Sequence, residues 1–344
     1  MTTKYSRPSS PAPHRISGPG ELLQAVPYLL GFHPRSSLVL VGLAAGELVV
    51  TARLDLVDTR AADVVGDTIE AMQQGGSSEF IAAVYDDGCE PDRSAGPPLP
   101  WSSLACRVGQ ATAAAGCEIV DVLLVSGQRW WSFTCESDDC CPPEGRVVPD
   151  EPSAFTAAAT YAGVVALPDR SALAAILDPL PDEARDALSA DIAAAENASV
   201  AAVLDGQLTR HQRSVKRAIF AAARSSGAPR WSGLPDVHVT RFGVALSEID
   251  IRDSVWMAID DGRLDGRALW RDLARRLPAP YDAAPLFLFG WAAWRAGDGA
   301  LAGIAAERAV LSDSEYSAAD LLLAALSRGL DPRRFPKLRL PRSA

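Results

Sequence analysis

The sequence lacks any apolar run of the roughly 18 residues that a membrane-spanning helix requires. Residues 1–15 also lack the apolar core of a secretory signal, and proline and serine are prominent in them. We therefore expect a flexible tail over residues 1–15 and a cytoplasmic protein with no membrane partner. In that compartment the six cysteines are expected to be reduced thiols.

Motifs of several common enzyme classes are also missing. The chain has no Gly-x-x-x-x-Gly-Lys-[Ser/Thr] loop for nucleotide phosphates and no Gly-x-Ser-x-Gly elbow for a nucleophilic serine. Histidine, a frequent acid–base group and metal ligand, occurs only four times. The formal net charge of −10 repels phosphate backbones, so bulk nucleic-acid binding is not expected, although the tail at residues 333–344 is basic.

The first half of the chain alternates strand-like and helix-like segments. Apolar, β-branched runs between turns predict strands, and apolar residues at helical spacing predict helices. The predicted strands are residues 37–43, 47–56, 80–85, 119–125 and 129–135, and the predicted helices are residues 61–74 and 101–115. This β-β-α-β-α-β-β order implies an α/β domain over residues 16–150, built on a mixed sheet. The strand at 119–125 is apolar almost throughout, which predicts a central position.

Residues 151–332 contain no convincing strand and predict an all-α domain. The predicted helices are residues 157–165, 171–177, 183–197, 199–224 and 237–259, with three more between 285 and 326. In the last segment Gly290, Ala302 and Ala309 fall at the small-residue offsets of a tetratricopeptide hairpin. A single copy is present, so ordinary antiparallel helices with alanine at close contacts are the alternative.

Residues 130–145, WWSFTCESDDCCPPEG, combine two tryptophans with three cysteines beside a Pro-Pro turn. Side chains alternate along a strand, so Trp131, Phe133 and Cys135 should share one face and Trp130 should lie on the other. One aromatic face is expected to enter the core while the other covers a helix or a pocket. Trp130 and Trp131 are therefore candidate ligand-binding residues.

Three interpretations of Cys135, Cys140 and Cys141 remain open. Packing as small buried side chains is favoured, because cysteine is among the most buried residue types, and no metal or other cofactor is predicted on that basis. Zinc is an alternative, but it prefers four ligands, and neighbouring cysteines are expected to point apart. Thiol chemistry is the other alternative, although the surrounding acidic residues should raise the thiol pKa.

Two further places carry candidate chemistry. In the loop PYLLGFHPRSS, residues 27–37, His33 is a candidate catalytic residue and Arg35 a candidate ligand for an anion. Asp55 and Asp86 are candidate catalytic carboxylates, because each lies at or just beyond the end of a predicted strand. If those strands are adjacent and parallel, both carboxylates reach the usual ligand crevice and could hold Mg²⁺. Turn shaping and capping are the alternative roles.

The predicted helix at 199–224 has a basic face. Its charged residues are Arg210, His211, Arg213, Lys216 and Arg217, with apolar residues opposite. Such a face is either solvated or a surface for an acidic ligand or partner.

Several motifs are similar as a set to the actinobacterial family of unknown function number 4192. They are PYLLGFHP followed by SLVLVGL, then RWWS-x-x-C with CCPPEG, then WAAWRAGDGALA. The resemblance spans about residues 16–332 and implies no particular activity, substrate or cofactor.

The sequence as a whole favours a non-catalytic binding or regulatory protein that acts through its helical domain. A protein or a small anionic ligand is the expected partner. An enzyme acting on an anionic small molecule at the sheet edge is one alternative. A thiol or zinc sensor at the cysteine hairpin is the other.

Overall fold

The computed structural model describes residues 16–60, 63–89, 91, 99–135, 137–333 and 335–338. The described chain divides into two compact units. One comprises residues 16–173 with Ser327–Asp331, and the other comprises residues 174–326 with the segment that follows Asp331. The first unit extends beyond residue 150, because α4 (Ala154–Tyr161) packs against α1 (Pro19–Leu30). The predicted tail at residues 1–15 lies outside the described residues.

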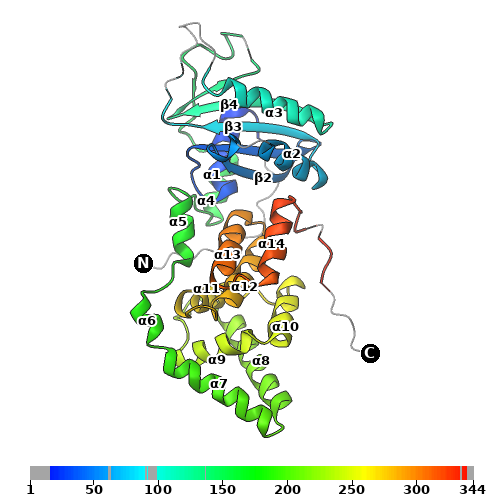
Figure 1. Ribbon diagram of the computed structural model, residues 1–344. Helices are drawn as coiled ribbons and strands as arrows, with labels where there is room; N and C mark the ends of the chain where they lie inside the picture. Colours follow the sequence, from blue (N-terminus) through cyan, green and yellow to red (C-terminus); the bar gives the residue numbers. More distant parts are fainter. Residues whose placement is uncertain are drawn as a thin grey trace. The chain divides into compact units, whose positions relative to one another are not determined.

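The first unit is built on one mixed sheet of six strands in the order β2-β1-β3-β4-β5-β6 (Figure 1). β3 and β4 run parallel, and every other neighbouring pair is antiparallel. The strands are β1 (Ser37–Ala44), β2 (Glu47–Asp55), β3 (Glu79–Tyr85), β4 (Glu118–Ser126), β5 (Arg129–Ser132) and β6 (Arg146–Val147). The predicted mixed sheet is confirmed, and β4 lies between β3 and β5 as expected for a strand covered on both faces.

Alternation along the strands divides the unit into two apolar layers. On one face Leu124 and Trp131 pack with α2 (Val64–Gln74) and α3 (Ser102–Ala114). On the other face Leu123 and Trp130 pack with Leu23 of α1. Both tryptophans are buried, each in a different layer, so neither ring lies open to a ligand.

Helix α1 occupies part of the segment that the sequence suggested was a loop. It continues through Pro27 and ends at Gly31, which takes the left-handed conformation with φ 84°. Proline removes one helical hydrogen bond. Leu22, Leu23 and Val26 are nevertheless buried along one side of α1, and this burial favours the helix.

The second unit is helical, as predicted. Its helices are η2 (Ala175–Leu177), α6 (Asp182–Asp186), α7 (Ser189–Leu204), α8 (Leu208–Ser225), α9 (Asp236–Leu246), α10 (Ile249–Asp260), α11 (Arg267–Arg276), α12 (Ala283–Arg295), α13 (Gly299–Ser312) and α14 (Ser317–Ser327), the last running one residue into the other unit. α5 (Arg170–Ala174) spans the boundary between the units. All residues of α12 except Arg295 are buried, so α12 forms the centre of the helical core.

Several helix boundaries differ from the predicted ones. The break expected after residue 197 occurs at residues 205–207 instead, where Gly206 has φ 66° and ends α7. The single helix predicted over 237–259 is two helices, α9 and α10, and α11 was not predicted. The three helices expected near the end are present as α12, α13 and α14.

Part of the basic tail packs onto the second unit. The backbone N–H of Leu338 donates to the buried carboxylate of Asp260 at 2.6 Å, and Trp291 Nε1 donates to the same carboxylate at 3.1 Å. Arg295 donates to Asp260 at 2.7 Å and to the carbonyl of Phe335 at 3.2 Å. The motif WAAWR therefore holds the segment at 335–338, while residues 339–344 lie outside the described residues.

Among the described residues, no single helix is both long and apolar enough to cross a membrane. Two helical segments joined at a sharp bend, Arg170–Asp186 and Ser189–Leu204, reach the length and apolar composition of a membrane span when they are counted together.

Candidate functional site: three thiols on a braced turn

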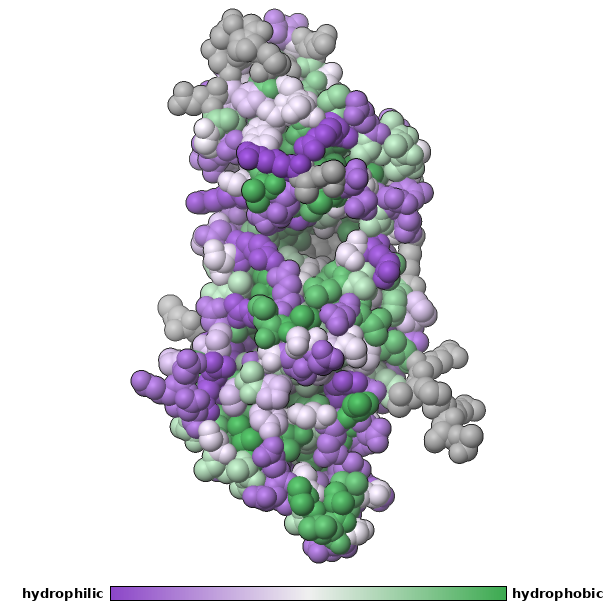
Figure 2. All heavy atoms as spheres, viewed as in Figure 1, coloured by the Kyte–Doolittle hydropathy of each residue, from purple (hydrophilic) through white to green (hydrophobic). Residues whose placement is uncertain are grey.

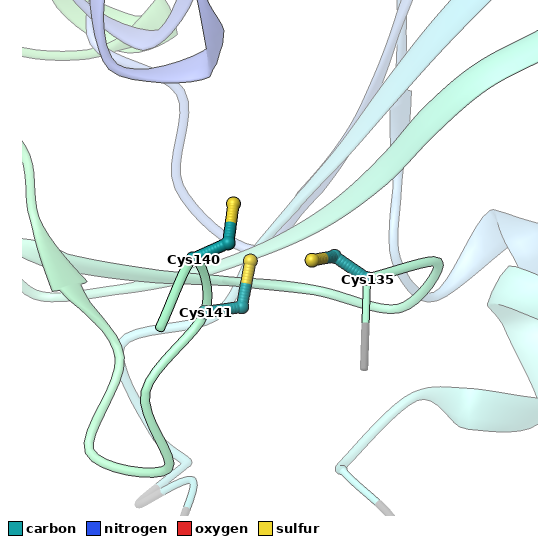
Figure 3. Close-up of side chains that lie close together, drawn as sticks. All are labelled: Cys135, Cys140 and Cys141. Atoms are coloured by element: carbon teal, nitrogen blue, oxygen red, sulfur yellow. The ribbon is translucent and has the colours of Figure 1, made fainter. Parts of the chain in front are cut away.

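The structure brings three cysteines together after β5. The Sγ atoms of Cys135, Cys140 and Cys141 all lie within 4.8 Å of one another (Figure 3). Cys140 and Cys141 direct their sulfurs to the same side, and Cys135 approaches Cys141 from across the loop. The expectation that neighbouring cysteines would point apart is therefore wrong here, because the turn between Ser137 and Gly145 rotates both side chains inward.

Packing accounts for Cys141 and in part for Cys135, but not for Cys140. Cys141 is 5% exposed and belongs to the apolar layer with Trp130. Cys135 is half-buried and Cys140 is exposed. A cluster of sulfurs that is buried on one side and open on the other can take up an ion or a reagent from solvent.

The strand ends earlier than expected, and this places Cys135. The Ser132 hydroxyl oxygen accepts hydrogen bonds from the backbone N–H groups of Thr134 at 3.1 Å and Cys135 at 3.0 Å. The same hydroxyl donates to the carboxylate of Asp121 on β4 at 2.7 Å. This local turn breaks the alternation, so Cys135 packs on the Trp130 side of the sheet and not with Trp131 as predicted.

Backbone hydrogen bonds fold the segment that carries the other two thiols. The carbonyl oxygen of Ser137 accepts from the N–H groups of Cys140 at 3.1 Å and Cys141 at 2.6 Å. The carbonyl of Pro142 accepts from Gly145 at 2.9 Å, and Gly145 has φ 76°. These bonds fix the backbone from which both thiols project.

Three long side chains brace this turn from outside. Arg129 donates to the carbonyl of Gly145 at 2.8 Å, and Trp131 Nε1 donates to the carbonyl of Pro143 at 2.9 Å. Arg146 donates to the carbonyl oxygens of Cys140 and, at 3.2 Å, Asp139. Neither Arg129 nor Arg146 was predicted to be a site residue. Their position next to the cysteine motif is the sequence feature that could have indicated their role.

Two of these thiols, Cys135 and Cys141, differ in their affinity for a proton. The pKa of Cys135 is lowered, first because the backbone N–H of Ser137 donates to its sulfur and then because Cys141 donates to it. The pKa of Cys141 is raised to about 12, mainly by burial and then by its hydrogen bonds with Cys135 and Cys140. Cys135 therefore ionises before Cys141. The expectation that nearby acids raise the pKa of these thiols does not hold at Cys135: among the described residues the charge of Asp121 raises its pKa, and this is the smallest of the effects.

A family model described as a domain of unknown function, DUF4192, matches residues 19–333. The chain belongs to this family. No curated protein and no solved structure matches the DUF4192 chain significantly. The matched region includes the thiol cluster, the braces around it and almost the whole of the helical unit.

The His33 loop of this DUF4192 protein lies apart from the cysteine turn in sequence and has its own partners. The backbone N–H of His33 donates to the carbonyl of Leu167 at 2.9 Å. Partial burial, and then Arg35, lower the pKa of the His33 imidazole. Hydrogen bonds from Ala172 and Ser171 lower the pKa of Asp169, and the charge of Arg35 adds a smaller effect. Arg35 thus lies near a carboxylate of its own chain, which lessens its attraction for an outside anion.

The candidate carboxylates reach the same edge of the sheet but not the same point. β2 and β3 are parallel to each other, yet β1 lies between them, and Ser37 pairs with both Asp55 and Tyr85. Two strand spacings separate the ends of β2 and β3 by about 10 Å. Asp86 accepts from Trp101 Nε1 at 2.8 Å and from the N–H of Gly88 at 3.0 Å. Asp55 forms an ion pair with Arg53. Both carboxylates have structural partners, so this edge resembles a capped turn more than a metal site.

Proposed function

We propose that this DUF4192 protein binds a thiophilic metal ion through Cys135, Cys140 and Cys141, and that the binding serves regulation and not catalysis. One observation carries the proposal: three sulfurs lie within 4.8 Å of one another on a turn braced by hydrogen bonds to its carbonyl groups. Thiolates are the ligands that soft metal ions prefer.

The number of ligands favours a particular class of ion. A structural zinc site takes four protein ligands, and among the described residues the ligand group consists of these three thiols. Soft ions that accept three thiolates in a plane, such as Cu(I), need no fourth group. With metal–sulfur bonds of about 2.3 Å, the sulfurs of such a site lie about 4.0 Å apart. The present spacing would need to contract by less than about 1 Å, which side-chain rotation alone can supply.

Proton release is part of the proposed reaction. Each thiol that binds the ion loses its proton, so affinity rises with pH. Cys135 loses its proton more readily than Cys141, because the pKa of Cys135 is lowered. Cys141, with a pKa of about 12, gives up its proton only when the positive charge of the ion replaces it. Cys135 is therefore expected to bind the ion before Cys141 does.

A reducing compartment such as the cytoplasm would keep the thiols available, and all six cysteines are thiols in the structure. In this proposal the helical unit provides the surface that binds a partner protein. Its α12–α13 hairpin is tetratricopeptide-like, supported by Gly290, where an added Cβ would lie 3.2 Å from the carbonyl oxygen of Ala302. Hairpins of that kind present surfaces to other proteins.

The test is a metal titration of protein prepared without metal in a reducing buffer. Cu(I) would be delivered from a bathocuproine disulfonate complex, and Zn²⁺ would be measured against a fluorescent chelator. We expect one Cu(I) per chain, bound more tightly than Zn²⁺. Replacing Cys135 or Cys141 with serine should weaken binding by more than about 100-fold, since even residues outside the ligand set change metal affinity by up to that amount.

The matched control is the double variant C106S/C117S, which removes two thiols outside the cluster. It should bind Cu(I) like the natural chain. Equal loss in the control and in C135S would refute the assignment. A native protein that has two cluster thiols joined in a disulfide, and that binds metal only after reduction, would favour thiol oxidation as the activity instead.

A further inference from the structure

Helix α7 has an unusual surface. Of its 16 residues Ile192 alone is buried, although the helix is composed mainly of alanine and valine. Val200 and Val203 are each 55% exposed and Leu204 is 81% exposed. Figure 2 shows apolar surface gathered at the lower end of the view, where Figure 1 places the turn between α7 and α8. Three large apolar side chains within five residues are thus exposed together, and such a patch is typical of a surface that a partner covers.

The next helix carries charges of one sign in a row. Arg210, Arg213, Arg217 and Arg224 are exposed on α8, and at 100° per residue they fall within an arc of about 60°. We call these four residues the arginine row. Val215 and Ile219 are buried on the opposite side, and the row extends about 21 Å along the helix.

The arginine row differs from the basic face expected from the sequence. Lys216 lies off it, with its ammonium group 3.5 Å from the Ser254 hydroxyl, and His211 is half-buried. Arg224 belongs to the row and also stacks over the ring of Phe220 at 5.6 Å. Within the described ranges no ion pair joins any of the four guanidinium groups to a carboxylate, whereas most of the ion-paired arginines of the protein have side chains that are largely buried.

The two features form one surface. α7 and α8 both pack on α9, and only residues 205–207 separate them. The exposed end of α7 therefore lies next to the start of the arginine row. An apolar strip beside a basic strip, each on a rigid helix, makes a shallow amphipathic face.

We propose that this face binds an acidic amphipathic helix of a partner protein. The partner's apolar side would cover Val200, Val203 and Leu204, and its glutamate and aspartate side chains would lie along the arginine row. Residues three, four and seven apart line one side of a helix, so a second helix can match these spacings along its length. The proposal does not depend on metal binding by the cysteines.

Other occupants fit the surface less well. A second copy of this chain that stacked α7 on α7 about a two-fold axis would also bring the two arginine rows together, and like charges repel. Nucleic acid would leave Leu204 exposed, and the net charge of −10 repels an extended polyanion. The net negative charge also repels an anionic membrane surface. The apolar strip on α7 has none of the aromatic residues that anchor interfacial helices.

The size of the face determines how tightly the partner helix is expected to bind. The arginine row is about 21 Å long and Val200–Leu204 span about 6 Å, so at a helix width of about 10 Å the face offers about 270 Å² per partner. That area is small and is expected to give a weak, transient complex. Binding should weaken as salt rises, because exposed guanidinium groups supply much of the attraction.

The experiment measures fluorescence anisotropy of a labelled 21-residue synthetic peptide with leucine on one helical face and glutamate on the other. We expect saturable, salt-sensitive binding to the full chain. R213E/R217E should weaken binding by at least about tenfold, and Leu204→Ser should also weaken it. The control R60E/R328E makes the same change of net charge at two exposed arginines of the other unit and should alter binding by less than about twofold.

Three results would overturn the proposal. The first is equal loss of binding in R60E/R328E and R213E/R217E, which would indicate attraction by net charge alone. The second is equal affinity for a peptide of the same composition in scrambled order. The third is tighter binding to duplex DNA or to phosphatidylserine vesicles than to the amphipathic peptide. Circular dichroism of each variant would verify that α8 remains helical.

Discussion

Gly145 is the residue whose replacement most directly tests how the thiol turn is built. It has φ 76°, a conformation that costs a residue with a side chain about 1–2 kcal/mol. A Cβ at this position would also meet three ring atoms of Trp131 within 2.8 Å. The Gly145→Ala variant therefore suffers backbone strain and a collision with a buried indole.

The collision can be relieved only by moving Trp131. That movement breaks the hydrogen bond from its Nε1 to Pro143, which contributes about 1 kcal/mol. It also disturbs an apolar layer, and overpacking of this kind costs about 1–3 kcal/mol. We expect Gly145→Ala to lower the free energy of unfolding of the first unit by about 3–6 kcal/mol in total.

Gly127 offers a matched control. It has φ 57°, and no atom lies within 4 Å of the position a Cβ would take. Gly127→Ala should therefore show the backbone cost alone, about 1–2 kcal/mol. The measurement is urea unfolding followed by tryptophan fluorescence, together with the rate at which a thiol reagent modifies Cys141. If the two variants lost equal stability, and Cys141 stayed equally protected in both, the bracing role of Trp131 would be refuted.

Two further predictions concern charge. Asp260→Ala should lower the free energy of unfolding of the helical unit by about 3–5 kcal/mol, because it leaves the Arg295 guanidinium buried without its carboxylate. Asp261→Ala, which breaks an exposed pair, should cost less than about 1 kcal/mol, and thermal unfolding of the two variants compares them directly. Cys141→Ala should raise the pKa of Cys135 by removing a thiol that donates to its sulfur. The pH profile of iodoacetamide modification, followed by mass spectrometry at Cys135, should then shift to higher pH. An unchanged profile would contradict the shared hydrogen bond.

The sheet could be predicted from the sequence because its signals are local. Apolar β-branched runs and the turns between them mark β1 to β5 without reference to distant residues. The strand at 119–125 was placed at the centre from its composition, and β4 has that position. The helical content of the second half followed from spacing in the same way.

The placement of the thiols could not be predicted, because it depends on distant partners. Cys135 leaves the expected face since Ser132 bonds to Asp121, which lies on another strand. The turn that brings Cys140 and Cys141 together is held by Arg129 and Trp131 from β5. None of these contacts has a spacing that a local pattern can reveal.

Helix α1 and the break before α8 show a different limit of prediction from sequence. Pro27 argues locally against a helix, yet burial against the sheet outweighs one lost hydrogen bond. In the alanine-rich stretch around residue 198 nothing marks a boundary, and the stronger signal was Gly206, which takes a left-handed conformation at the end of α7.

The braces around the cysteine turn argue for a site that exists before its ligand. Arginine and tryptophan side chains donate to carbonyl groups of the turn and hold its backbone in place. Cys140 is exposed, so burial does not explain its presence beside the buried Cys141. A turn that already holds three sulfurs within 4.8 Å loses little further conformational freedom when an ion binds. It follows that weakening a brace should reduce metal affinity even when every thiol remains. An Arg146→Ala variant that kept full affinity would show that the bracing serves the fold and not the ion.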